Sequence, residues 1–172
     1  MKLKKAPLFS LYSEHLLKLM LMESQACMYL EGMVTLSTGP SVQRYMARMK
    51  LDIEEHQALI IQLLQVSDPV VWKCADRTEI EVARTIADLI DAINLSRLSN
   101  SGLINAAVRL QSYMLAEYQR AIALARFLGA NSDVNRLSGI CKAKRVRRSG
   151  LVALQLVHMA ASPTYQPLAR AR

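Results

Sequence analysis

The chain has 172 residues, of which 52% are hydrophobic and 5% aromatic, with only six Gly and five Pro. This scarcity of aromatic residues and turn formers argues against a β-sandwich or barrel and predicts an all-α protein with one hydrophobic core. The net charge of +8 lies in the C-terminal part, because eight Lys and Arg follow Asp133, the last acidic residue. Such an asymmetry occurs in proteins that bind an anionic partner, which is one interpretation of it.

Five helices are predicted in chain order from apolar residues at helical spacing. Gly39 and Pro40 end the first helix, and the second ends before Pro69, because the residue before a proline avoids helical geometry. Thr78 and Glu81 form a capping box that opens the third helix. The predicted helices cover residues 8–35, 41–65, 78–98, 103–128 and 132–161.

The lengths of these helices predict how they pack. Four of them have about 25 residues or more, which corresponds to roughly 40 Å of helix. Long helices joined by short breaks favour an antiparallel four-helix bundle, in which the shorter third helix crosses between the two helix pairs. We therefore expect residues 1–161 to form a single domain and residues 162–172 to form a flexible tail.

Three features of the sequence indicate the cellular compartment: the cysteines, the N-terminal segment and the hydropathy. The three cysteines are far apart and form no CxxC motif, which argues against a disulfide framework or a zinc site and favours a reducing compartment. Ser13, Glu14 and Lys18 interrupt the apolar N-terminal run, so an export signal is not expected. No uninterrupted apolar run approaches the roughly 18 residues that a membrane span needs. These features predict a cytoplasmic protein without membrane contact.

Each long predicted helix carries an ionisable residue on its apolar face. Glu23, His56 and Glu117 have apolar neighbours at helical spacing on the first, second and fourth helices. Lys144 and Arg148 occupy the apolar face of the fifth helix. The helical period turns all five side chains toward the interior. Because an unpaired buried charge is costly, these groups need either a metal ion or one another.

Three explanations remain open for these residues. Carboxylates and a histidine from several helices could bind iron or manganese, as in di-iron bundles. Interior cations could instead pair with the carboxylates, or the carboxylates could snorkel outward while the histidine is an ordinary hydrogen-bonded core residue. The candidate metal ligands are Glu23, Glu55, His56 and Glu117, with Glu54 as the alternative to Glu55. The candidate core ion-pair residues are Glu23, Glu117, Lys144 and Arg148.

The basic run "KAKRVRR" is a candidate anion-binding surface, because its cations cannot all face the interior of one helix. Several of them together could bind nucleic acid or another anionic surface in a salt-dependent way. The candidate anion-binding residues are Arg136, Lys142, Arg145 and Arg147. No helix-turn-helix motif or aromatic stacking set accompanies them, and a simply solvated basic face is the alternative.

Two segments resemble the YciE/YciF group of bacterial ferritin-like proteins. "LINAAVRLQSYMLAEYQRAIALARFLG" (Leu103–Gly129) is similar to the third core helix of that group, with an Ala-rich opening and an apolar run that ends in Leu-Gly. "ESQACMYLEGM" (Glu23–Met33) resembles the group's Glu-x-Gln start, and Pro40 and Gln57 also fit. The resemblance covers about residues 10–160. It implies a ferritin-like four-helix bundle with an extra crossover helix, usually dimeric, with a di-iron centre and a link to stress responses.

The chain departs from this group at the metal-ligand positions. Gln111–Met114 stands where the group has Glu-His-Tyr-Glu, and Ile53 stands where a ligand is expected. The basic run Lys142–Arg148 aligns with acidic residues of the group's last helix, and Glu23 alone is retained in place. We therefore expect a protein that has lost its di-iron centre and binds no cofactor, with bound iron or manganese as the alternative.

Three hypotheses for function follow from these observations. The first is a non-catalytic structural or interaction module, which forms a homodimer or binds another protein. The second is a metal-binding redox or storage protein, and the third is a nucleic-acid or anionic-surface binding protein. No GxSxG, HExxH or glycine-rich phosphate loop supports hydrolytic or phosphoryl-transfer chemistry, so we do not expect an enzyme.

Overall fold

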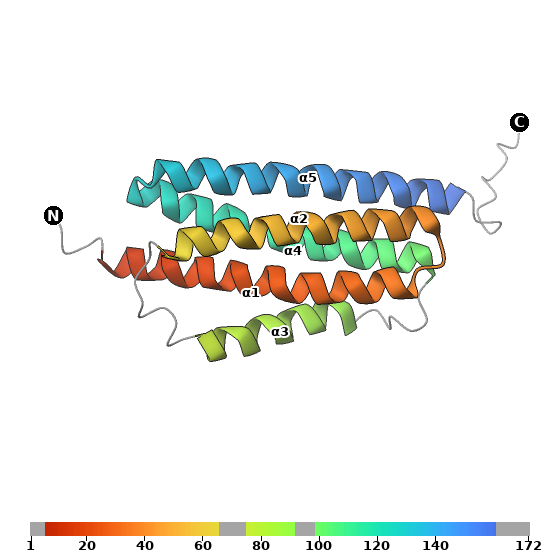
Figure 1. Ribbon diagram of the computed structural model, residues 1–172, viewed down its shortest axis with the longest axis horizontal. Helices are drawn as coiled ribbons and strands as arrows, with labels where there is room; N and C mark the ends of the chain where they lie inside the picture. Colours follow the sequence, from red (N-terminus) through yellow and green to blue (C-terminus); the bar gives the residue numbers. More distant parts are fainter. Residues whose placement is uncertain (1–5, 66–74, 92–98, 161–172) are drawn as a thin grey trace, which may run out of the picture.

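The computed structural model describes residues 6–65, 75–91 and 99–160, and these residues form five helices and no strand (Figure 1). The helices are α1 (Ala6–Leu36), α2 (Pro40–Gln65), α3 (Ala75–Asp91), α4 (Asn100–Leu128) and α5 (Asn131–Ala160). The prediction of an all-α protein is therefore confirmed. Within the described ranges, none of the helices combines the length and the continuous apolarity that a bilayer crossing requires.

The predicted helix ends lie close to the observed ones except in the third helix. α3 begins at Ala75, so the predicted capping box at Thr78 is wrong. The Thr-x-x-Glu pattern also occurs inside helices, because both residue types are tolerated there. The predicted end of this helix at Leu98 and the predicted tail at residues 162–172 lie outside the described residues. α4 ends as predicted at Gly129, whose φ of 77° is left-handed and favours glycine.

The four long helices lie side by side along the long axis of the molecule, with α3 on the outside (Figure 1). α1 packs mainly against α2, and α4 packs mainly against α5. Each of these pairs is antiparallel because its connection is only two or three residues long. α1 also packs against α4, whereas α2 and α5 have a much smaller contact. α3 covers α1 and touches α4.

The core is built from aliphatic and methionine side chains of the long helices, together with Val82 and Ile86 of α3. Burial of each large apolar side chain stabilises the fold by about 1.5–3 kcal/mol. Seven polar or charged residues are also buried in the described part of the chain, and they include four ionisable groups. These seven are Ser13, Ser37, Gln111, Glu23, His56, Glu117 and Lys144.

Asn100 at the start of α4 fastens the connection between α1 and α2. Its Oδ1 accepts hydrogen bonds from Ser37 Oγ at 3.1 Å and from the backbone N–H of Thr38 at 3.2 Å. Its Nδ2 donates to Thr38 Oγ1 at 3.3 Å. A Cβ atom at Gly39 would lie 2.8 Å from Asn100 Nδ2, so the close approach requires glycine. These contacts fix the axial position of α1 against α4, and thereby the level at which their polar side chains meet.

Candidate functional site

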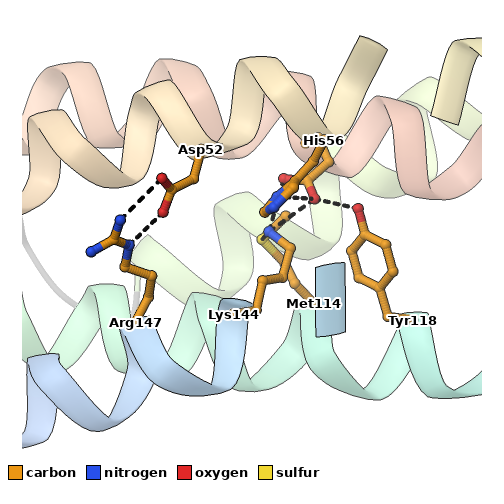
Figure 2. A network of polar contacts seen from close by, with 7 residues as sticks. Asp52, His56, Met114, Tyr118, Lys144 and Arg147 are labelled. Atoms are coloured by element: carbon orange, nitrogen blue, oxygen red, sulfur yellow. Dashed lines mark hydrogen bonds and ion pairs between the residues drawn. The ribbon is translucent and has the colours of Figure 1, made fainter. Parts of the chain in front are cut away.

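Four polar side chains, one from each long helix, meet inside the core (Figure 2). They are Glu23 of α1, His56 of α2, Tyr118 of α4 and Lys144 of α5. We call these four residues the Glu23 cluster. Each of them follows apolar residues at helical spacing, which is why each helix turns it toward the interior.

Lys144 binds Glu23 directly within this cluster. Its Nζ lies 2.8 Å from Glu23 Oε1 and 3.0 Å from Glu23 Oε2, so the ammonium group contacts both carboxylate oxygens. Nζ also lies 3.9 Å from the sulfur of Met114 and 5.5 Å from the centre of the Tyr118 ring. Glu23 is fully buried and Lys144 is only 2% exposed. The two charges therefore depend on each other, since solvent reaches neither.

Tyr118 and His56 complete the surroundings of the Glu23 carboxylate. The Tyr118 hydroxyl donates a hydrogen bond to Glu23 Oε1. His56 Nδ1 lies 3.6 Å from the same oxygen, without the geometry of a hydrogen bond. These contacts add polar stabilisation to the carboxylate beyond what Lys144 supplies.

The electrostatics keep Glu23 ionised and Tyr118 protonated. Burial alone would raise the pKa of Glu23, but the Lys144 ammonium and the contact with His56 outweigh it, so the pKa lies below its ordinary value. Burial and then the adjacent Glu23 carboxylate raise the pKa of Tyr118 well above its ordinary value. The cluster is thus an ion pair supported by a neutral phenol donor.

Arg148 does not join this cluster, contrary to the core ion-pair prediction. It is exposed, and its Nε donates to Ser112 Oγ at 2.7 Å. The inward face of α5 runs through Lys144 and Leu151, with the half-buried Arg147 between them. Arg147 and Arg148 lie on either side of the helix face that carries Lys144. The rotation of α5 about its axis turns Arg147 toward the interior and Arg148 toward solvent.

Arg147 forms a second ion pair with Asp52 of α2, beside the Glu23 cluster (Figure 2). Its guanidinium donates to both carboxylate oxygens, with Nη2 3.1 Å from Oδ1. Tyr45 donates to the backbone carbonyl of Arg147 at 2.8 Å. The hydrogen bond to Asp52 raises the pKa of Arg147. Arg147, predicted as an anion-binding residue, is therefore already occupied by a carboxylate of this chain.

Glu117 belongs to a separate group, and it pairs with neither Lys144 nor Arg148. Its carboxylate lies 3.1 Å from His15 Nε2 and 3.7 Å from Lys18 Nζ, and it accepts a 2.5 Å hydrogen bond from Arg120. His15 and Lys18 precede Glu23 on α1 by one to two helical turns. The two interior carboxylates therefore have separate sets of partners.

The predicted metal ligands are not assembled into one site. Glu54 and Glu55 are exposed, and Glu117 lies in the separate group with His15 and Lys18. Among the described residues, no three His, Cys, Asp or Glu side chains gather in a way that could hold a metal ion. A buried ammonium already binds both oxygens of Glu23. This donor set does not fit a di-iron centre, which needs several carboxylates around the metals.

The cysteines in the described part of the chain are free thiols that are partly or fully shielded from solvent. Cys141 is buried and Cys27 is half-buried, and neither forms a disulfide. Burial raises the pKa of both thiols, so little thiolate is present near neutral pH. Cys74 lies outside the described residues.

The space next to the Glu23 cluster is small. A cavity of about 10 Å³ lies beside His56, Gln111 and Lys144, which is room for about one water molecule. A groove of about 400 Å³ between α2 and α5 lies outside it and is lined by residues that include His56, Lys142 and Arg147. The Glu23 carboxylate is therefore enclosed by side chains and does not line an open pocket.

Three residues of the site were missed by sequence reasoning. Tyr118 is an aromatic residue on an apolar helix face, which is typical of an ordinary core position. Asp52 lies one turn before His56 and so faces the same way, a signal that could have been used. Gln111 is buried with its Oε1 lacking a hydrogen-bond partner in the described part of the chain.

Acid is expected to destabilise the protein in two separate steps. Burial, followed by the charges of Lys18 and Arg120, lowers the pKa of His15 despite Glu117, so its stabilising contribution is complete above about pH 6.5 and is lost below that value. The lowered pKa of Glu23 makes its contribution complete above about pH 4.3 and lost at lower pH. Urea unfolding from pH 7 to pH 3 measures both steps. In a His15→Gln variant the upper step should disappear and the lower step should remain; an unchanged upper step would contradict the assignment.

These observations define an all-α protein whose largely apolar interior contains ion pairs between helices. Residues 8–152 match the model of a family described as "Domain of unknown function (DUF892)", and the chain belongs to this family. No curated protein was found to match the chain. No solved structure was found to match it either.

Proposed function

We propose that this protein is a non-catalytic, ferritin-like four-helix bundle protein of the YciE/YciF type, in which a buried lysine takes the place of a di-iron centre. The observation that carries the proposal is the contact of Lys144 Nζ with both oxygens of Glu23, at 2.8 and 3.0 Å. The two antiparallel pairs of long helices, with α3 on the outside, support the ferritin-like assignment.

The residues around Lys144 support the replacement of an acidic metal site by a neutral ion pair. Gln111 and Met114 stand where the resemblance places two glutamates. Met114 contacts Lys144 Nζ through its sulfur, and Gln111 lines the small cavity next to it. The loss of two carboxylates together with the gain of one ammonium leaves a single balanced ion pair with Glu23. Metal ions would add positive charge to a site that no longer has the carboxylates to neutralise it.

In this proposal the interior holds an ion pair in place of a cofactor, so the protein acts through contacts on its surface. We propose a structural or interaction module in the bacterial cytoplasm, linked to stress responses and active as a homodimer, as the family resemblance implies. Large apolar side chains exposed toward the end of α5 support a protein partner. They are Val152, Leu156, Val157 and Met159. Light scattering coupled to gel filtration would measure the mass in solution, and a purely monomeric protein would contradict the homodimer.

Metal analysis is the experiment that tests this function. We expect protein purified under native conditions from iron- and manganese-supplemented medium to contain only trace iron, manganese and zinc. The physical reason is that the Lys144 ammonium neutralises Glu23 and repels a cation. Stoichiometric metal that a Glu23→Gln substitution removes would instead support the metal-binding alternative.

A further inference from the structure

A pocket of about 330 Å³ opens between α4 and α5 and shares no residue with the Glu23 cluster. Its volume is at the lower end of the range for small-molecule sites. Ile122 and Cys141 are buried and form its apolar base, and the other four side chains are polar. The lining residues are Gln119, Ile122 and Arg126 of α4 with Ser138, Cys141 and Arg145 of α5.

Arg126 and Arg145 give this pocket an excess of positive charge. Both are exposed, and neither guanidinium group makes a hydrogen bond or an ion pair with any residue in the described ranges. Lys144 and Arg147, in contrast, both bind carboxylates of this chain. No acidic side chain lines the pocket. Two guanidinium groups without a partner in the described ranges therefore line one concave surface, which favours an anionic ligand.

The other polar groups of the pocket suit a phosphate group. A guanidinium presents a planar fork of N–H donors that matches phosphate oxygens, and charge-assisted hydrogen bonds of this kind are among the strongest. Ser138 has a hydroxyl donor and Gln119 an amide donor. Two cations match the charge of a phosphomonoester, which is close to a dianion at neutral pH. A carboxylate would neutralise only one of them.

A small molecule fits this surface better than a polynucleotide does. The cations of the basic run do not form one continuous stripe, because Lys144 is buried and Arg147 is bound to Asp52. Binding along a nucleic-acid backbone needs several available cations in sequence. We propose that the pocket between α4 and α5 binds a small phosphorylated molecule, whose phosphate group lies between Arg126 and Arg145.

The proposal is tested by titrating the protein with inorganic phosphate and with glycerol phosphate at constant ionic strength, while backbone amide shifts are followed by NMR. Saturable shifts are expected for pocket residues such as Gln119 and Ser138. Arg126→Gln or Arg145→Gln should weaken binding about tenfold, the size expected for loss of a charge-assisted hydrogen bond. Arg136→Gln is the matched control, because it removes the same charge from an exposed site on α5 that does not line the pocket.

Three results would overturn the proposal. The first is the absence of saturable shifts in the pocket with either probe. The second is equal weakening by the control and by the pocket variants, which would indicate attraction by net charge alone. The third is binding of a single-stranded oligonucleotide or of phosphatidic acid vesicles without binding of the free phosphate probes. All substituted positions are exposed, so thermal unfolding should be unchanged in each variant.

Discussion

Replacement of Glu23 by alanine is expected to destabilise the protein by about 3–5 kcal/mol, because it leaves the Lys144 ammonium buried without a partner. The loss would be measured as a decrease in the free energy of unfolding in urea. Glu54→Ala is the matched control, since Glu54 is an exposed glutamate whose removal should change stability by less than about 0.5 kcal/mol.

Removal of both charges should be much milder than removal of one. In Glu23→Met combined with Lys144→Met, no unpaired charge remains and apolar groups fill similar volumes. The Tyr118 hydroxyl then loses its acceptor, which costs about 1–3 kcal/mol. Adding Tyr118→Phe should recover part of that cost. If the double variant is as unstable as Glu23→Ala, the two charges do not stabilise each other and the interpretation of the cluster fails.

Gly150→Ala is expected to destabilise the protein by about 1–3 kcal/mol, although alanine normally favours a helix interior over glycine by about 1 kcal/mol. A Cβ atom at Gly150 would overlap the Tyr45 hydroxyl and lie 2.8 Å from Tyr45 Cζ. Tyr45 cannot move away without breaking its hydrogen bond to the carbonyl of Arg147. That carbonyl belongs to the residue that binds Asp52, so the disturbance reaches the contact between α2 and α5.

The same helix provides the control for this prediction. A Cβ atom at Gly139 would meet nothing within 4 Å, so Gly139→Ala should stabilise the protein by about 0.5–1 kcal/mol. Chemical unfolding of both variants gives the comparison. In a Tyr45→Leu background, Gly150→Ala should lose most of its cost. Equal stabilisation by the two alanine substitutions would show that Tyr45 does not restrict the backbone of α5.

The fold class was predictable because helical periodicity is a local property of the sequence. Apolar residues at helical spacing and few turn formers led to the all-α prediction, and Gly129 marked the end of α4 correctly. The start of α3 was less predictable, because the pattern from Thr78 to Glu81 is compatible with both a helix start and a helix interior. No sequence signal distinguished the two.

The candidate site was predictable in part. Glu23 and Lys144 stood out because each is a charged residue among apolar neighbours, and the structure brings the two together. Glu117 stood out for the same reason, yet it meets His15 and Lys18 instead of a cation of α5. Periodicity gives the direction in which a side chain points around its helix. It does not say which residue of a neighbouring helix that side chain meets.

Arg148 illustrates the same limit for rotation about the helix axis. With 3.6 residues per turn, residue 147 lies about 60° to one side of the direction of Lys144 and residue 148 about 40° to the other side. The packing of α5 against α4 and α2 decides between them, and it places Arg147 on Asp52 and Arg148 on Ser112. The sequence alone is compatible with either Arg147 or Arg148 facing the interior.

Helical periodicity and turn residues are enough to predict that the chain is helical, where most of its helices end, and that several charges lie on apolar faces. The partners of these charges follow from the packing of the helices: Lys144 for Glu23, Asp52 for Arg147, and His15, Lys18 and Arg120 for Glu117. Hydrogen bonds and ion pairs form over about 3 Å, whereas a shift of one residue along a helix moves a side chain by about 1.5 Å and turns it by about 100°. Side-chain pairing between helices therefore depends on axial position and rotation, which the packing of the whole core sets.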